Sequence, residues 1–352
     1  MNSKILLPYC IPPVVSYTSI AYAMSIYLAY PEVENWFATQ YINLWSPIHE
    51  KGMRPDSYGG VTPLNMLGGD AHGGALPLRY EKHRKTERIA SRETLIETIY
   101  QCLKQGVYIF TFIDYGQIFH YDPLVHNILL IGANLDAKVL YALGYQLNNG
   151  PGHFQIFQIP FSQFVDAYYS EVGENSNQSF VMITFRQPGA VFSWEALKTQ
   201  LTDYGGSRLS YDRMKDYYDE SDTAYFTFLV NSQRQNPYVY GLQCYESMNY
   251  YLKFHREIGN AYLDQRIFRV FMEHKTLMVR RFRYLAERRA FAIDWNPALE
   301  AYEDVERRAT ILFNLILKLQ WEPQRGYSKG MDTLKVLEEK ERNIFSRIMD
   351  RV

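Results

Sequence analysis

Cysteine, histidine and carboxylate side chains are the groups in this chain whose types suggest chemistry. Cys10 lies in PYCIPP near the N-terminus, Asp114 lies in FIDYGQ, and His126 lies at the start of the apolar run HNILLIGA. A thiol beside an imidazole makes a nucleophile and its general base, and a carboxylate can orient the imidazole. The motifs GxGxxG, GxxxxGK[ST], HExxH and GxSxG are absent from the sequence, which argues against Rossmann, P-loop, zincin and ordinary serine-hydrolase chemistry.

A structural role is the alternative for each of these groups. Free cysteine is among the most buried residue types, and a histidine at a strand end more often packs than reacts. The Asp114 side chain is equally suited to capping the turn into Tyr115. His72 and His120 have aspartates nearby, but their spacing fits no metal motif, so we expect neither a metal nor a cofactor.

The region around Cys10 predicts where its thiol would stand. Two prolines follow the cysteine and suit the first turn of a helix, so we predict a helix over about 13–30. A second helical piece is predicted over 35–45. Residues 46–77 lose all periodicity and collect glycine and proline, which predicts a long loop that covers or contacts a substrate.

Five short β-branched or aromatic runs predict an antiparallel sheet. The runs are 107–113, 127–133, 138–145, 153–159 and 180–185. Their connections are mostly short, and NNGPG between the third and fourth is a strong turn signal, which favours antiparallel pairing over a doubly wound sheet. Helices are predicted at 91–106, starting at Ser91 and stopping at Gly106, and over SQFVDAYY before the last strand.

The composition changes after about residue 205, where long amphipathic helices take over. We therefore predict an α+β domain over 1–205 and a helical domain over 206–352. One of these helices carries VRRFRYLAERR. Its arginines are Arg280, Arg281, Arg283, Arg288 and Arg289. They are suited to an acidic protein surface or a phosphate, although the interleaved Glu287 favours an ordinary solvated face.

Composition bounds the class of protein. Of the 352 residues, 47% are apolar and 21% charged, so the chain can bury a core. The net charge of -1 argues against a general nucleic-acid binder. Three scattered cysteines build no disulfide framework, which favours a cytoplasmic location. The uncharged N-terminal stretch imitates a signal peptide, but its tyrosines, serines and prolines favour a buried helix, so we expect no membrane association.

Two segments of the chain resemble the butirosin biosynthesis protein H-like family. The first is VYIFTFIDYGQIFHYDPLVHNILLIGANLDAKVLYALGYQ followed by HFQIFQIPFSQFVDAYYS, and its sharp element is FxD followed by a histidine at a strand start. The second is LDQRIFRVFMEHKTLMVRRFRYLAE, with the pattern DxRxFxxxxEHKxxMxxR. The resemblance implies a papain-like N-terminal domain, with a cysteine at a helix start and a histidine on a later strand.

The resemblance also implies acyl transfer in natural-product biosynthesis, such as that of nonribosomal peptide antibiotics. Cys10 would take an acyl or peptidyl group from the phosphopantetheine thioester of a carrier protein, and His126 would move the proton. The group would pass to the amine of a small molecule or peptide, with Asp114 as the carboxylate of the shared block. The strand KVLYALGY lacks the Asn or Asp that papain-like sites place there.

Two other functions remain open at this point. A thioesterase or peptidase would use the same Cys10 and His126 pair but pass the acyl group to water. A non-catalytic scaffold or peptide-binding protein of a biosynthetic cluster would use neither. The sequence also leaves a homodimer open.

Overall fold

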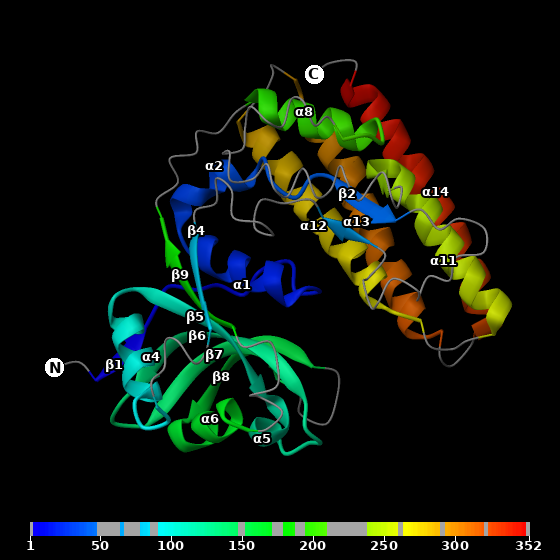
Figure 1. Cartoon of the computed structure of the whole chain (residues 1–352). Coiled ribbons are helices and arrows are strands. Elements are labelled where there is room, and N and C mark those ends of the chain that lie inside the picture. The colour runs from blue at the N-terminus through cyan, green and yellow to red at the C-terminus, as the bar shows by residue number, and fades with distance from the viewer. Residues whose placement is uncertain are drawn as a thin grey trace. The chain divides into compact units, whose positions relative to one another are not determined.

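The computed structural model describes most of the chain and divides it into two compact units. The described residues are 3–47, 64–66, 78–84, 91–146, 152–170, 179–186, 194–209, 238–259, 263–288, 293–319 and 323–349. One unit comprises Met1–Glu34 and Leu76–Gly189, and the other Asn35–Ala75 and Ala190–Val352 (Figure 1). The predicted boundary at 205/206 differs from this division, because the chain crosses to the helical unit near residue 35 and returns before the central strands.

The first unit is built on an antiparallel sheet, as predicted. Its strands are β1 (Lys4–Leu6), β4 (Leu78–Arg84), β5 (Val107–Asp114), β6 (Val125–Asn134), β7 (Val139–Gln146), β8 (His153–Pro160) and β9 (Ser179–Phe185). Their order is β4-β9-β5-β6-β7-β8, with β1 beside β6. The five predicted runs are confirmed as β5 to β9. β4 was not predicted, because LRYEKHR is too charged to read as a strand.

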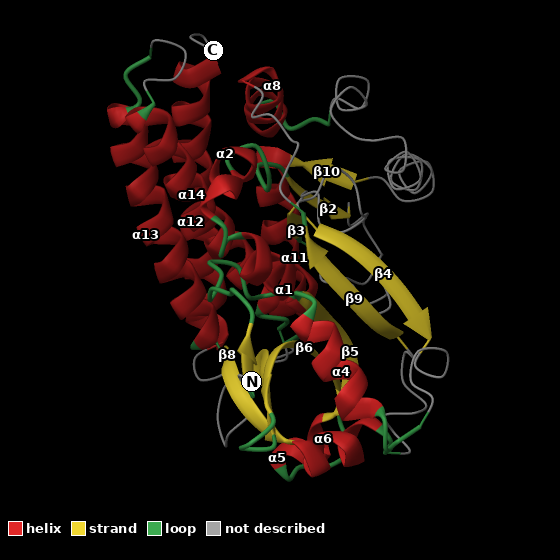
Figure 2. Ribbon diagram, turned by 90° about the vertical axis from the view of Figure 1, so that its left-hand side faces the viewer, coloured by secondary structure: helices red, strands yellow, loops and turns green. Residues whose placement is uncertain are grey.

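Three helices cover one face of this sheet (Figure 2). They are α4 (Leu95–Lys104), α5 (Tyr115–Phe119) and α6 (Phe161–Tyr168). Ile99 of α4 and Phe164 of α6 are fully buried in one cluster with Ile109 of β5. α4 begins at Leu95 rather than Ser91, although it ends as predicted just before residue 106.

Helix α1 (Thr18–Tyr27) packs on the opposite face of the sheet. The Tyr22 ring lies 5.7 Å from that of Phe110, which alternates with the residues that face α4. The helix is shorter than the predicted 13–30. Before it, the Leu7 N–H donates to the carbonyl of Ile131 on β6, and Tyr17, the N-cap of the helix, has extended backbone angles.

The second unit is mainly helical, as predicted for the C-terminal part. Its elements are α2 (Glu34–Phe37), β2 (Leu44–Pro47), β3 (Asn65–Met66), α8 (Trp194–Gly205), β10 (Tyr238–Tyr240), η5 (Gly241–Gln243), α11 (Cys244–Ile258), α12 (Arg266–Glu287), α13 (Asn296–Leu317) and α14 (Pro323–Met349). α12 packs on α13, α13 on α14, and α14 on α11. None of the described helices has the length and apolarity needed to cross a bilayer.

Two predictions for residues 35–77 change in the structure. The helix predicted over 35–45 is wrong, because the helix ends at Phe37 and β2 pairs antiparallel with β10. Most of the predicted long loop over 46–77 lies outside the described residues, and residues 64–66 within it form β3, which pairs with β2.

Candidate functional site

Cys10 lies beside the C-terminal half of α1, not at its start. Its Sγ is 3.7 Å from the carbonyl oxygen of Met24, and its backbone N–H donates to the carbonyl of Ser25 at 2.9 Å. The helix begins only at Thr18. Carbonyl groups point toward the C-terminal end of a helix and make it the negative end of the dipole, which disfavours a thiolate. The helix-start environment expected for the thiol is therefore not found at Cys10.

His126 stands near the start of β6, as predicted, and faces the side of the sheet that α4, α5 and α6 cover. It pairs across the strands with Ile113 of β5, and Ile113 belongs to the core beneath those helices. Its Nδ1 lies 3.0 Å from the carbonyl oxygen of Asn127. In the neutral ring, Nδ1 therefore carries the hydrogen and donates it. Burial lowers the pKa of His126 below its ordinary value of 6.5, with the bond to Asn127 opposing the shift.

The two predicted partners of the dyad thus have different surroundings. Cys10 belongs to the α1 side of the sheet, through its contacts with Met24 and Ser25. His126 alternates onto the other side, where its ring lies 4.7 Å from that of Tyr115. A resting dyad needs nucleophile and base within hydrogen-bond reach. The described contacts of the two side chains do not supply that arrangement.

Asp114 caps a turn, which is the structural alternative weighed from the sequence. Its side chain is buried, and its Oδ1 accepts from the N–H groups of Gly116 at 2.9 Å and Leu124 at 3.1 Å. It is the N-cap of α5. A Cβ on Gly116 would lie 2.7 Å from the carbonyl oxygen of Asp122, so the turn needs a glycine here. The carboxylate stabilises the connection from β5 to β6.

A cluster of tyrosines surrounds His126 and was not predicted. The Tyr115 hydroxyl lies 3.3 Å and the Tyr22 hydroxyl 2.8 Å from the carbonyl oxygen of Asn127, and both donate to it. The Tyr145 ring stands edge-on to His126 at 6.4 Å, and its hydroxyl donates to the carbonyl of Val15. Only the high count of 30 tyrosines hinted at this cluster.

The electrostatics of the tyrosine cluster favour neutral groups. Burial raises the pKa values of Tyr22 and Tyr115, so both hydroxyls stay protonated and donate. Gly144 leaves the space that they need, since a Cβ there would lie 2.6 Å from the Tyr115 hydroxyl. The cluster thus contains a neutral imidazole and neutral phenols, each engaged with the backbone or a neighbouring ring.

A cavity of about 490 Å³ opens next to Asp114. It is lined by residues of α5, of the turn that follows it and of α6, including His120, Gln163 and Asp166. Cys10 and His126 are not part of its lining. Within the described residues, no group of three or more His, Cys, Asp or Glu side chains is arranged to hold a metal ion.

The motif EHKxxMxxR of the helical unit is buried. His274 donates from Nε2 to the carbonyl of Ile42 at 2.8 Å, and Arg281 donates from Nε to the carbonyl of Ala38 at 2.8 Å. Both side chains hold α12 to the segment that precedes β2. Arg281 is therefore not on a solvated arginine face as expected; exposed Arg283 pairs instead with Glu303 at 3.1 Å.

The other predicted arginines of this helix have separate roles. The Arg280 guanidinium lies over the Phe37 ring at 5.1 Å, and that of Arg288 lies over Tyr284 at 5.1 Å. Arg289 lies outside the described residues.

Comparisons with known proteins identify no relative of this chain. No protein-family model matches the chain, and no curated protein matches it significantly.

Proposed function

We propose that this chain is a non-catalytic binding protein whose first unit, expected to be papain-like, serves as a scaffold. The observation that carries the proposal is the position of Cys10, which lies beside the C-terminal half of α1 rather than at the helix start. A papain-like nucleophile depends on the positive end of its helix dipole for thiolate formation.

The surroundings of the other two predicted groups support the same function. The His126 ring lies tilted beside that of Tyr115, and its Nδ1 donates a hydrogen bond to the backbone of its own strand. One carboxylate oxygen of Asp114 accepts hydrogen bonds from two backbone N–H groups. All three side chains therefore have structural roles that require no substrate. The chain corresponds to the scaffold or peptide-binding alternative of a biosynthetic cluster.

The cysteine acyltransferase remains the second candidate function. Cys10 is only half-buried and is not in a disulfide, and the lowered pKa of His126 keeps its imidazole neutral, the form that accepts a proton. In that function the thiol would attack a carrier-bound acyl thioester and release the phosphopantetheine thiol of the carrier, and the acyl group would then pass to an amine or, in a thioesterase, to water.

Intact-mass measurement separates the two candidates. The protein is incubated with the N-acetylcysteamine thioester of decanoic acid, with and without an amine acceptor, and thioester loss is followed in parallel. We expect no gain of the decanoyl mass and no loss of thioester above the rate with Cys10→Ala. Acylation that disappears in both Cys10→Ala and His126→Phe would overturn the proposal in favour of the enzyme. Acylation that His126→Phe leaves unchanged would be uncatalysed thiol exchange at the half-buried cysteine and would not favour the enzyme.

A further inference from the structure

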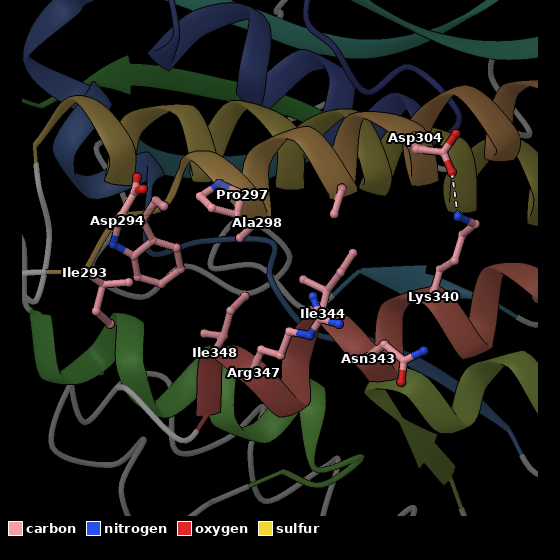
Figure 3. Close-up of a pocket in the computed structure, with 12 residues that line it drawn as sticks. Ile293, Asp294, Pro297, Ala298, Asp304, Lys340, Asn343, Ile344, Arg347 and Ile348 are labelled. Carbon is pink, nitrogen blue, oxygen red and sulfur yellow. Dashed lines mark ion pairs between the residues drawn. The ribbon is translucent and has the colours of Figure 1, made fainter.

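A groove of about 350 Å³ lies between the start of α13 and the end of α14 (Figure 3). We call it the α13–α14 groove. Its apolar lining includes Trp295, Pro297, Ala298, Ala301, Ile344 and Ile348. The volume is within the range of small-molecule sites, roughly 300–1,000 Å³, which are mostly apolar with few polar groups. All of these residues belong to the second unit.

The groove exists because the facing side chains of α13 are small at this level. Tyr302 and Val305 fill the helix contact and are fully buried. Ala298 and Ala301 lie on the groove side of the same helix. Their methyl groups extend less far toward α14 than larger side chains would, so the space beside Ile344 stays open. Trp295 forms part of the wall and is almost wholly shielded from solvent.

The charged side chains of the groove differ in whether a partner holds them. Lys340 at one end lies 2.9 Å from Asp304, a carboxylate that it shares with Arg307 and Arg308. Asp294 at the other end accepts from the N–H of Asn296 at 3.1 Å. Arg347 is exposed, and no carboxylate among the described residues pairs with it. In Figure 3 the Arg347 side chain extends from α14 toward the space between the helices.

We infer that the α13–α14 groove binds an apolar carboxylate of the medium-chain fatty-acid type. The alkyl chain lies against Trp295, Ile344 and Ile348, where its burial provides affinity. The carboxylate meets the Arg347 guanidinium, whose planar fork matches carboxylate geometry. The site is separate from Cys10 and His126, so the inference does not depend on whether the first unit is catalytic.

Titration calorimetry with the full chain tests the ligand class. Decanoate should bind saturably at one site, and hexanoate more weakly, by up to roughly fourfold for each CH₂ group removed. Decanol, which lacks the carboxylate, should bind more weakly than decanoate. Failure of decanoate to bind, or binding of decanol as tight as that of decanoate, would overturn the inference.

Two variants locate the ligand in the groove. Arg347→Gln should weaken decanoate binding about tenfold, the loss of one charge-assisted interaction, and leave decanol binding unchanged. Arg342→Gln, an exposed arginine of the same helix outside the groove, is the matched control and should bind decanoate as the wild type does. Ala301→Trp should fill the groove and abolish binding, with its thermal unfolding confirming that it is folded.

Each contrary result has a definite meaning. Unchanged decanoate binding by Arg347→Gln, or by folded Ala301→Trp, would place the ligand elsewhere and overturn the inference. A wild-type protein that ignores decanoate but self-associates, while Ala301→Trp is monomeric, would assign the groove to a second copy of the chain. If Ala301→Trp does not fold, the comparison of Arg347→Gln with Arg342→Gln decides alone.

Discussion

The Nζ of Lys275 lies 2.7 Å from Oε2 of Glu341, and both side chains are fully buried in the helical unit. Tyr245 donates to the same carboxylate at 2.5 Å, Tyr204 donates at 3.1 Å, and Tyr302 donates as well. Burial lowers the pKa of Lys275, and the Glu341 carboxylate counters that shift. The pair joins α12 to α14, far apart in the sequence, through one satisfied polar network.

Removing the negative charge of this pair should destabilise the protein strongly. Glu341→Gln leaves the Lys275 ammonium buried without a counter-charge, for which we expect a loss of about 3–5 kcal/mol in the free energy of unfolding. Urea denaturation measures it. Glu339→Gln, an exposed glutamate of the same helix, should change stability by less than about 0.5 kcal/mol.

A double variant tests the charge pairing itself. Lys275→Met combined with Glu341→Gln removes both charges while the amide oxygen still accepts from the tyrosines, so it should be more stable than Glu341→Gln alone. If the double variant is the less stable of the two, packing of the lysine stem rather than its charge governs the site.

We expect Asp114 to contribute to the stability of the fold rather than to catalysis. Asp114→Ala removes the acceptor for the N–H groups of Gly116 and Leu124, and we expect a loss of about 1–2 kcal/mol. Asp114→Asn retains an acceptor oxygen and should lose less. Asp122→Ala, an exposed aspartate of the same connection, is the control. Thermal and urea unfolding measure these differences, and wild-type stability of Asp114→Ala would show that the cap contributes nothing.

Stability should fall as the pH decreases from about 7 to 5. Burial lowers the pKa of His126 and, more strongly, that of His274 below 6.5 in the folded state. Between the folded pKa and 6.5 the unfolded chain binds more protons, so acid favours unfolding, by up to about 1.4 kcal/mol per pH unit for each histidine. The midpoint of urea denaturation against pH reports this slope.

Substitution of one histidine should flatten that pH dependence. His126→Phe removes one titrating group and should lose less stability than the wild type between pH 7 and 5. Equal slopes for His126→Phe and the wild type would mean that the imidazole of His126 is protonated as easily in the fold as in the unfolded chain.

Local patterns predicted the sheet but not the site. Strands such as β6 and β7 are runs of apolar residues with turn signals between them, and both appear close to their predicted bounds. The segment before α1 is tied instead by bonds beyond its local sequence, since the Leu7 N–H donates to Ile131 and the Cys10 N–H to Ser25, and the helix begins only at Thr18. Proline spacing alone placed that start too early, and with it the expected environment of Cys10.

Burial of charge is the second feature that local patterns missed. The arginine-rich helix predicts a solvated face, yet Arg281 is buried because the carbonyl groups of residues 38 and 40 need donors. The partner of Lys275 lies 66 residues further along the chain, so periodicity could not reveal it. These bonds form because α12 contacts both residues 38–42 and α14, which lie far from it in the sequence.

The three thiols should differ in reactivity by burial. Cys10 is half-buried, whereas Cys102 and Cys244 are buried, and burial also raises the pKa of Cys244. With dithionitrobenzoate at pH 8, the native protein should release one equivalent of chromophore rapidly and the other two only on unfolding. Cys10→Ser should abolish the rapid phase, and Cys102→Ser should leave it intact. Because Cys10 lies at the negative half of α1, its rate should not exceed that of an unactivated thiol such as glutathione; a much faster reaction would point to an activated nucleophile and favour the acyltransferase.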